Sequence, residues 1–384
     1  MDGTLVAPDW PPLTLAELRP LLAQFPDLGE PERIVSVSPR PFSAAGIVAT
    51  SRARVFAKRH HRAVRDREGL LEEHRFLAQL LAHGAPVARV LVTAEGETAI
   101  ECGDWTYEIH EIPAGSDLYE DAISWTPFVS AAHAHAAGVA LARLHLAARE
   151  FAAPPRKPRP LVASFTIFAA QEPAVALKHF LAARPSLTEN RSVHQCANLA
   201  LELLAPSHAD LAPLLPALPP LWTHNDLHAS NLFWSDASPG AHATAIIDFG
   251  LADRTNAVHD LAHAIERNIV EWLKLVSDPA HPDAVPIHLD HLAALLDGYE
   301  SIRPLSAEES AALAPMTALC HAEFALSEAD YFLGVLHSEG KAAMAYDGWL
   351  VGHARWFSSA PGRKLVDALR QRAETRQSRG GACK

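Results

Sequence analysis

The fold of this chain is best inferred from two nearby stretches, THNDLHASN at residues 223–231 and IIDFG at residues 246–250. Between them lie two short apolar runs, 232–234 and 243–247, which are separated by turn-forming residues. This pattern predicts a β-hairpin. Such a hairpin would bring Asn231 and Asp248 close together, because each residue adjoins one of its strands.

The polar side chains of these stretches fit the chemistry of phosphoryl transfer. That reaction needs a carboxylate that faces the acceptor hydroxyl, and oxygen ligands that hold Mg²⁺ against the phosphates. Asp226, Asn231 and Asp248 meet that need. The spacing H-x-D-x-x-x-x-N from His224, followed by D-F-G, also matches the catalytic segments of kinases.

Two other interpretations apply to the same residues. Taken singly, each His, Asp or Asn is an ordinary polar residue of a loop, and only the joint pattern favours a kinase site. His224 and His228 also form H-x-x-x-H, a spacing that on a helix can hold zinc with a further ligand. The pair has no intervening Glu, and the preceding Pro219 and Pro220 favour a loop, so zinc is the weaker interpretation.

Composition indicates a globular intracellular protein. The 384 residues are 49% hydrophobic, which suffices for two domains with substantial cores. The net charge of -12 argues against a nucleic-acid partner, because phosphate neutralisation needs clustered Lys and Arg. The four cysteines have no C-x-x-C spacing, and neither a signal peptide nor a membrane-spanning run is evident. We therefore expect a soluble cytoplasmic protein without a membrane partner.

The N-terminal third begins with an expected helix at 14–24, capped by Thr14, within a lead-in segment 1–30. Strand-like runs at 34–37 and 54–58 flank the segment 41–46, which we predict to be a turn covering the phosphates. Ser43 and Gly46 are its candidate nucleotide contacts, because backbone amides approach phosphates closely where side chains are small. With a single glycine, the segment taken alone favours an ordinary hairpin.

Lys58 ends a Val-Phe-Ala-Lys strand and resembles the kinase lysine that contacts the α- and β-phosphates. The following residues, 69–83, have helical periodicity and include Glu72 and Glu73. A glutamate on this helix can hold the lysine ammonium toward the phosphates. Both glutamates are also explained as solvent-facing residues.

Further strands are expected at 87–92, 98–102 and 105–109. The sequence then changes from sheet-like to helical, and Glu111 and Ile112 lie at that change. We predict that this segment is the hinge whose backbone contacts adenine.

The rest of the chain is mainly helical, with helices expected at 131–150, 174–204, 289–299, 307–336 and 340–370. Asp260, shortly after the D-F-G, is expected to cap the helix that follows. Within 307–336, a polar stripe includes Glu323, Asp330 and Tyr331. If it faces the active site, it would bind the acceptor, but a solvated helix face is the more common explanation of such a stripe.

Together these segments make the chain resemble the aminoglycoside phosphotransferase/choline kinase family, from about residue 34 to about residue 264. The likeness is carried by the Lys58 strand, the Glu-Glu-His-x-Phe helix at 72–76, the Ala-x-Leu-His helix ending at His145, and the catalytic stretch through Asp-Leu-Ala at Asp260. The segment 72–74 also resembles a bacterial stress-response kinase subgroup of this family.

The resemblance implies an α+β, bilobal protein-kinase-like fold that binds ATP between its lobes. A small antiparallel-sheet N-lobe would span 31–112, and a larger, mainly helical C-lobe would span 113–384. By the same resemblance, Asp226 would be the catalytic base or hydroxyl-orienting carboxylate, and His224, in the same loop, would be a second catalytic residue. Asn231 and Asp248 would bind Mg²⁺.

In the N-lobe, the resemblance implies that Lys58 contacts the nucleotide phosphates. Glu73 matches the helix glutamate better than Glu72 does, by its distance to Gly84.

The function implied is an ATP- and Mg²⁺-dependent transfer of the γ-phosphoryl to a hydroxyl of a small molecule, such as an aminoglycoside, choline, homoserine or a sugar-like acceptor. A protein Ser/Thr kinase of the stress-response type is the alternative, although no long activation segment or Ala-Pro-Glu follows the D-F-G. A non-catalytic nucleotide-binding regulator is a further alternative, disfavoured because such a protein needs neither a base nor metal ligands. The sequence identifies neither the acceptor nor the oligomeric state.

Overall fold

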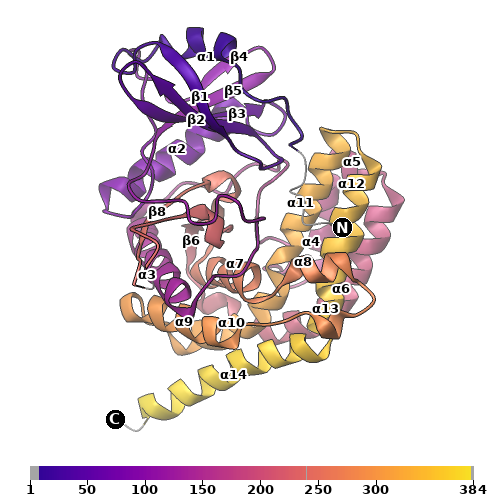
Figure 1. The fold of residues 1–384 in the computed structure, drawn as a ribbon. Coiled ribbons are helices and arrows are strands. Elements are labelled where there is room, and N and C mark those ends of the chain that lie inside the picture. The colour runs from indigo at the N-terminus through magenta and orange to yellow at the C-terminus, as the bar shows by residue number, and fades with distance from the viewer. Residues whose placement is uncertain (1–7, 239, 382–384) are drawn as a thin grey trace.

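The computed structural model describes residues 8–238 and 240–381. Its N-terminal part is a five-stranded antiparallel sheet with the strand order β1-β2-β3-β5-β4 (Figure 1). The strands are β1 (Pro31–Val37), β2 (Ala44–Thr50), β3 (Arg54–His61), β4 (Ile100–Cys102) and β5 (Trp105–Glu111). Lys58 on β3 pairs with Glu108 on β5, so both side chains point to the same face of the sheet.

Two helices accompany this sheet. Helix α1 (Leu15–Leu22) begins at Thr14, whose side chain accepts a hydrogen bond from the Glu17 amide at 3.3 Å, as expected for a cap. Its leucines form one buried cluster with strand residues such as Val48 and Ile109. The expected lead-in helix is therefore part of the sheet's core, whereas residues 1–7 lie outside the described residues. Helix α2 (Arg67–Ala82) follows β3 and is capped by Asp66.

Two local expectations for this region are wrong. Gly46 lies inside strand β2 and not in the turn, which spans residues 38–43. A Cβ atom at Gly46 would lie 2.4 Å from the Ser36 carbonyl oxygen, so the glycine permits close strand pairing. The run 87–92 forms no strand; Val87 and Val90 make only isolated bridges, with Ile246 and His110 respectively.

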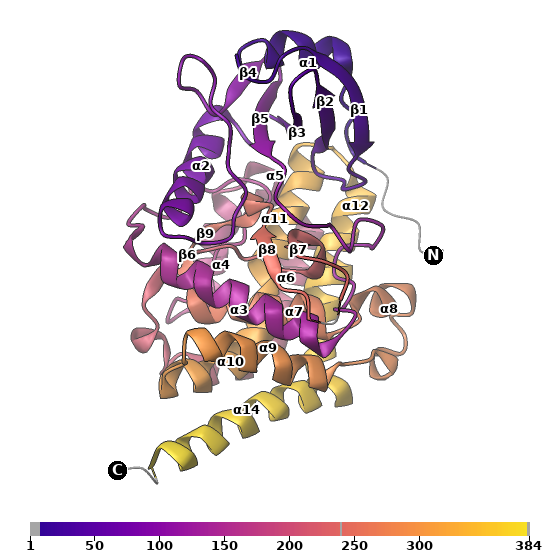
Figure 2. The ribbon, with the colours of Figure 1, turned by 60° about the vertical axis from the view of Figure 1, so that its left-hand side comes forward.

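The C-terminal lobe is built mainly from helices (Figure 2). They are α3 (Ala131–Ala147), α4 (Pro173–Ala182), α5 (Pro185–Thr188), α6 (Arg191–Leu211), α7 (Ala257–Ile269), α8 (Trp272–Ser277), α9 (Leu289–Ile302), α10 (Ala307–Leu319), α11 (His321–Gly334), α12 (Glu339–Ala343), α13 (Gly352–Phe357) and α14 (Ala360–Gly381). A π-helical stretch (Met344–Val351) joins α12 to α13. Among the described residues, no helix has the length and apolar character needed to cross a membrane.

Four short strands underlie the junction of the two lobes. The predicted hairpin is present: β7 (Leu232–Trp234) pairs antiparallel with β8 (Ala243–Ile246). A second pair, β6 (Pro220–Thr223) with β9 (Asp253–Asn256), lies beside it. The sheet-plus-helix arrangement confirms the α+β kinase-like fold class predicted from the sequence.

Helices α3 and α9 pack closely because each contributes a glycine where the other's backbone crosses it. A Cβ atom at Gly138 would lie 2.0 Å from the Leu295 carbonyl oxygen, and one at Gly298 would lie 2.0 Å from the His135 carbonyl oxygen. Both obstacles are backbone atoms, so a side chain can be accommodated only by moving the helices apart.

We expect Gly138→Ala to lower the free energy of unfolding by about 1–3 kcal/mol, because overpacking outweighs alanine's higher helix propensity. Urea denaturation of both proteins measures this difference. Gly340→Ala in α12 is the matched control, because nothing lies within 4 Å of its added Cβ. An unchanged unfolding midpoint for Gly138→Ala would show that this crossing is not tightly packed.

Candidate active site

The loop 224–231 is held in place by a carboxylate from helix α7. Asp260 accepts hydrogen bonds from the backbone amides of His224, at 2.8 Å, and Asn225, at 2.7 Å, and lies 3.0 Å from His145 Nε2. Asn225 has a left-handed backbone with a φ of 62°, a strained conformation that these contacts stabilise. We expected Asp260 to cap its helix, but Asn256 is the cap, and Asp260 instead fixes the catalytic loop.

Asp226 lies in this loop with a mostly buried side chain, 17% exposed. Its Oδ1 is 3.1 Å from Arg267 Nε, and Asn231 Nδ2 donates to its backbone oxygen at 2.9 Å. Burial raises the pKa of Asp226 to about 6, although the Arg267 charge opposes that shift. The carboxyl can therefore exchange a proton near neutral pH, as a general base must.

His224 is fully buried behind the loop. Its Nδ1 accepts a hydrogen bond from the Asp226 amide at 3.1 Å, and its Nε2 donates to the Ile247 carbonyl at 2.9 Å. The imidazole thus ties the Asp226 loop to the segment that precedes Asp248. Both ring nitrogens are thus engaged within the chain, and the catalytic role assigned to His224 from the sequence stays a prediction.

The hairpin brings Asp248 beside Asn231, as the sequence predicted, because the Ile247 amide donates to the Asn231 carbonyl at 3.0 Å. Asp248 has a left-handed backbone, with a φ of 60°, and its side chain is 41% exposed. Lys58 Nζ lies 2.9 Å from its Oδ1. Desolvation would raise the pKa of Asp248, but the Lys58 ammonium holds it well below the ordinary value.

Glu73 does not make the expected ion pair with Lys58. Its Oε2 lies 3.6 Å from Arg156 Nη2, whereas Lys58 is paired with Asp248. Glu72 lies near Arg159, at 3.8 Å, so neither glutamate is the solvent-facing residue of the alternative interpretation. Burial of Lys58 would lower its pKa, but nearby carboxylates raise it. Asp248 has the largest such effect, and Glu73 contributes a smaller one.

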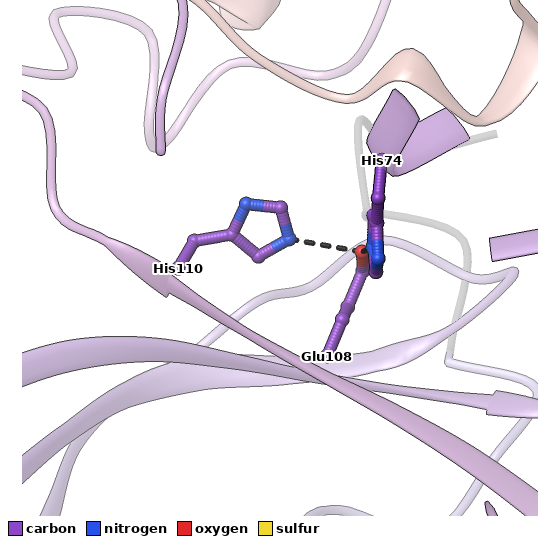
Figure 3. Close-up of side chains that lie close together, drawn as sticks. All are labelled: His74, Glu108 and His110. Carbon is purple, nitrogen blue, oxygen red and sulfur yellow. Dashed lines mark hydrogen bonds and ion pairs between the residues drawn. The ribbon is translucent and has the colours of Figure 1, made fainter. Parts of the chain in front are cut away.

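A carboxylate surrounded by histidines lies beside Lys58 in the N-lobe (Figure 3). Glu108 Oε2 lies 2.8 Å from His74 Nε2 and 2.9 Å from His110 Nε2, and its Oε1 lies 2.9 Å from His60 Nε2. Burial would raise the pKa of Glu108, but these imidazoles, His110 foremost, hold it well below the ordinary value. Both carboxylate oxygens thus have hydrogen-bond donors.

The predicted nucleotide segments lie around the sheet. Ser43 is buried at the end of the turn between β1 and β2, and Glu111 ends β5 with an exposed side chain 3.5 Å from Arg89. Ile112 follows it. The same turn carries Arg40, which was not predicted. Burial lowers the pKa of Arg40, and the charges of Asp117, Asp248 and Asp226 oppose that shift.

The three predicted acceptor residues of α11 are all engaged within the chain. Glu323 accepts hydrogen bonds from the side chains of Ser164, at 2.6 Å, and Thr166, at 2.9 Å. Asp330 accepts from Ser186 and lies 3.7 Å from Arg184 Nε, and Tyr331 donates to Asp9 at 3.0 Å. Since all three are buried, the stripe is neither a solvated face nor an open binding surface.

Arg267 is the main residue of the site that the sequence analysis missed. It follows Asp260 by seven residues, or two helical turns, so both lie on the face of α7 that meets the catalytic loop. The signal available in the sequence was the spacing of seven residues that places Arg267 on the same helix face as Asp260.

A small antiparallel sheet above a helical lobe, with Lys58, Asp226, Asn231 and Asp248 near their junction, is the arrangement of a kinase-like phosphotransferase. The model of the "Phosphotransferase enzyme family" matches residues 46–305. The chain belongs to this family and is a phosphotransferase enzyme. Among curated protein sequences, none matches it.

Several solved structures have the same fold at low sequence identity. An aminoglycoside phosphotransferase from Alicyclobacillus acidocaldarius subsp. acidocaldarius DSM 446 is 16% identical, with a TM-score of 0.53 over 95% of this chain and 98% of its own. A microcompartment-associated aminopropanol kinase is 17% identical, with a TM-score of 0.57 and coverages of 91% and 99%. The amicoumacin kinase hAmiN, in complex with AMP-PNP, Ca²⁺ and Ami, is 14% identical, with a TM-score of 0.55 and coverages of 88% and 92%.

Proposed function

We propose that the enzyme transfers the γ-phosphoryl of ATP to a hydroxyl group of a small molecule in a Mg²⁺-dependent reaction. One observation carries the proposal: side chains from both lobes lie close together at their junction. They are Lys58 from the sheet and Asp226, Asn231 and Asp248 from the helical lobe. In this proposal, Asp226 faces the acceptor hydroxyl, and Lys58 contacts the nucleotide phosphates. The segment 31–112 supplies the nucleotide side and 113–384 the acceptor side, in the cytoplasm.

The donor set suits Mg²⁺, which prefers hard oxygen ligands. The low pKa of Asp248 keeps its carboxylate charged, and its 41% exposure leaves it accessible. Asn231 directs its Nδ2 to the Asp226 backbone oxygen, so its Oδ1 is the atom left for a metal. When bound, the ion would neutralise charge on the phosphates.

A small-molecule acceptor is supported by the named similar structures. One is an aminopropanol kinase, and another is an amicoumacin kinase solved with the ATP analogue AMP-PNP and Ami. The short connection from the D-F-G to α7 supports the same proposal, since it leaves no long segment on which a peptide would lie.

ATP consumption by the purified protein with Mg²⁺ tests the proposal. The acceptors are aminoglycosides, choline, ethanolamine, aminopropanol, homoserine, methylthioribose and sugars, each assayed alongside Asp226→Asn. Turnover that needs an acceptor and is lost in the variant would establish the reaction. ATP binding without turnover on any acceptor, together with labelling of proteins in a lysate, would instead favour protein phosphorylation.

We expect kcat/KM to rise with pH through about 6. Asp226 must be deprotonated to accept the hydroxyl proton. Because burial raises its pKa from an ordinary 3.8 to about 6, it becomes protonated at a higher pH than an exposed aspartate does. A pH profile of kcat/KM at saturating Mg²⁺ measures this. A profile flat down to pH about 4.5 would exclude Asp226 as the titrating base.

A further inference from the structure

A second cluster of two histidines and a carboxylate lies deep in the helical lobe. Glu266 near the end of α7, His321 at the start of α11 and His353 in α13 are each at most 3% exposed. The Glu266 Oε1 atom is 3.2 Å from His353 Nδ1 and 3.6 Å from His321 Nδ1. One ligand atom from each residue lies within 4.8 Å of those of the other two.

These spacings are compatible with metal coordination. Ligands about 2.0–2.1 Å from a tetrahedral zinc ion are roughly 3.3 Å apart, between the two distances observed here. In the described residues, both carboxylate oxygens of Glu266 and all four ring nitrogens of the two histidines lack a hydrogen-bond partner. Leaving that many buried polar atoms unsatisfied is costly, which favours an occupant of the cluster.

The N-lobe cluster around Glu108 provides an internal comparison. It also has a Glu and histidines, but its contacts are 2.8–2.9 Å, ordinary hydrogen-bond lengths, and both carboxylate oxygens are engaged. Nothing in Figure 3 therefore requires a bound ion. The two clusters have similar residue types but different contact distances, so the Glu108 cluster serves as a control for the Glu266 cluster.

The surroundings of Glu266 hold the cluster in place. The neighbouring Arg267 is paired with Asp226, at 3.1 Å, although its charge also reaches both histidines. Trp272 stacks on His353 with ring centroids 3.7 Å apart, and its Nε1 donates to the Glu266 backbone oxygen at 2.8 Å. These contacts fix two of the three ligands.

We propose that Glu266, His321 and His353 bind a divalent transition-metal ion of the zinc class, at a site separate from the Mg²⁺ site. Two imidazoles and one carboxylate are ligands typical of such ions. The ion would tie α7 to α11 and α13. Since Arg267 adjoins Glu266, this tie would also hold the guanidinium against Asp226.

The test uses the full chain, produced without a polyhistidine tag, stripped with a chelator and reloaded with Zn²⁺ or Co²⁺. After gel filtration, we expect about one metal ion per chain by mass spectrometry of the elements, and a cobalt absorption spectrum typical of tetrahedral coordination. Glu266→Gln and His353→Gln should each lose this ion. A wild-type protein that binds neither metal after reloading would overturn the proposal.

His74→Gln is the matched control, because it removes a histidine from the N-lobe cluster instead. It should keep the metal content and the cobalt spectrum of the wild type. Circular dichroism establishes whether each variant is folded. If the Glu266 and His353 variants do not fold, His74→Gln and His291→Gln decide together, because the described residues contain two other clusters of possible ligands, around Glu108 and at His288, Asp290 and His291. A cobalt spectrum unchanged in both supports the site at Glu266, and a spectrum lost in either overturns the proposal.

Discussion

Asp226→Asn is expected to lower kcat by about 10²- to 10⁴-fold, the usual contribution of a general base, and to change ATP affinity little. The amide has nearly the same shape, but its one oxygen can accept from only one of Arg267 and Asn231, which lie 3.1 Å and 3.4 Å from the two carboxylate oxygens. The variant loses the ability to accept the hydroxyl proton, together with the charge that is paired with Arg267. Steady-state kinetics with the acceptor identified by the panel measures kcat, and isothermal titration with an ATP analogue measures binding.

Asp236→Asn is the control for that substitution. Asp236 lies in the exposed turn of the β7–β8 hairpin, where it bonds to Ser235 and Ser238, so the same chemical change there should leave kcat unaltered. A kcat for Asp226→Asn within about 3-fold of wild type would reject the role assigned to the carboxylate, since a lost base cannot leave so small an effect.

The parts of the fold that the sequence predicted correctly depend on local patterns. The hairpin around 232–246 has apolar runs with a polar turn between them, and α2 has helical periodicity with its cap just before it. The wrong assignment of Gly46 arose because glycine is common in turns, whereas here it relieves a contact with a neighbouring strand. Such a contact depends on strand pairing, which single-residue preferences do not contain.

In the active site, the motif residues Asp226, Asn231 and Asp248 could be predicted because they follow one another closely around a single hairpin. Arg267 could not, because its contact with Asp226 depends on the packing of α7 behind the loop. Glu323 was misplaced for a related reason. A polar residue on a helix can face solvent, an active site or a buried loop, and helical periodicity does not distinguish these surroundings.

Asp248→Asn is expected to lower kcat/KM by about 10²- to 10³-fold and to raise the Mg²⁺ concentration needed for half-maximal rate, because a neutral amide is a weaker ligand for the ion. It also removes the anion 2.9 Å from Lys58 Nζ, so the lysine can turn toward the phosphates. Titrating the rate with Mg²⁺ at fixed ATP separates the two effects: weakened metal binding shifts the midpoint, whereas a freed lysine changes the KM for ATP alone. An unchanged Mg²⁺ midpoint would remove Asp248 from the metal site and leave Asn231 as its sole proposed protein ligand.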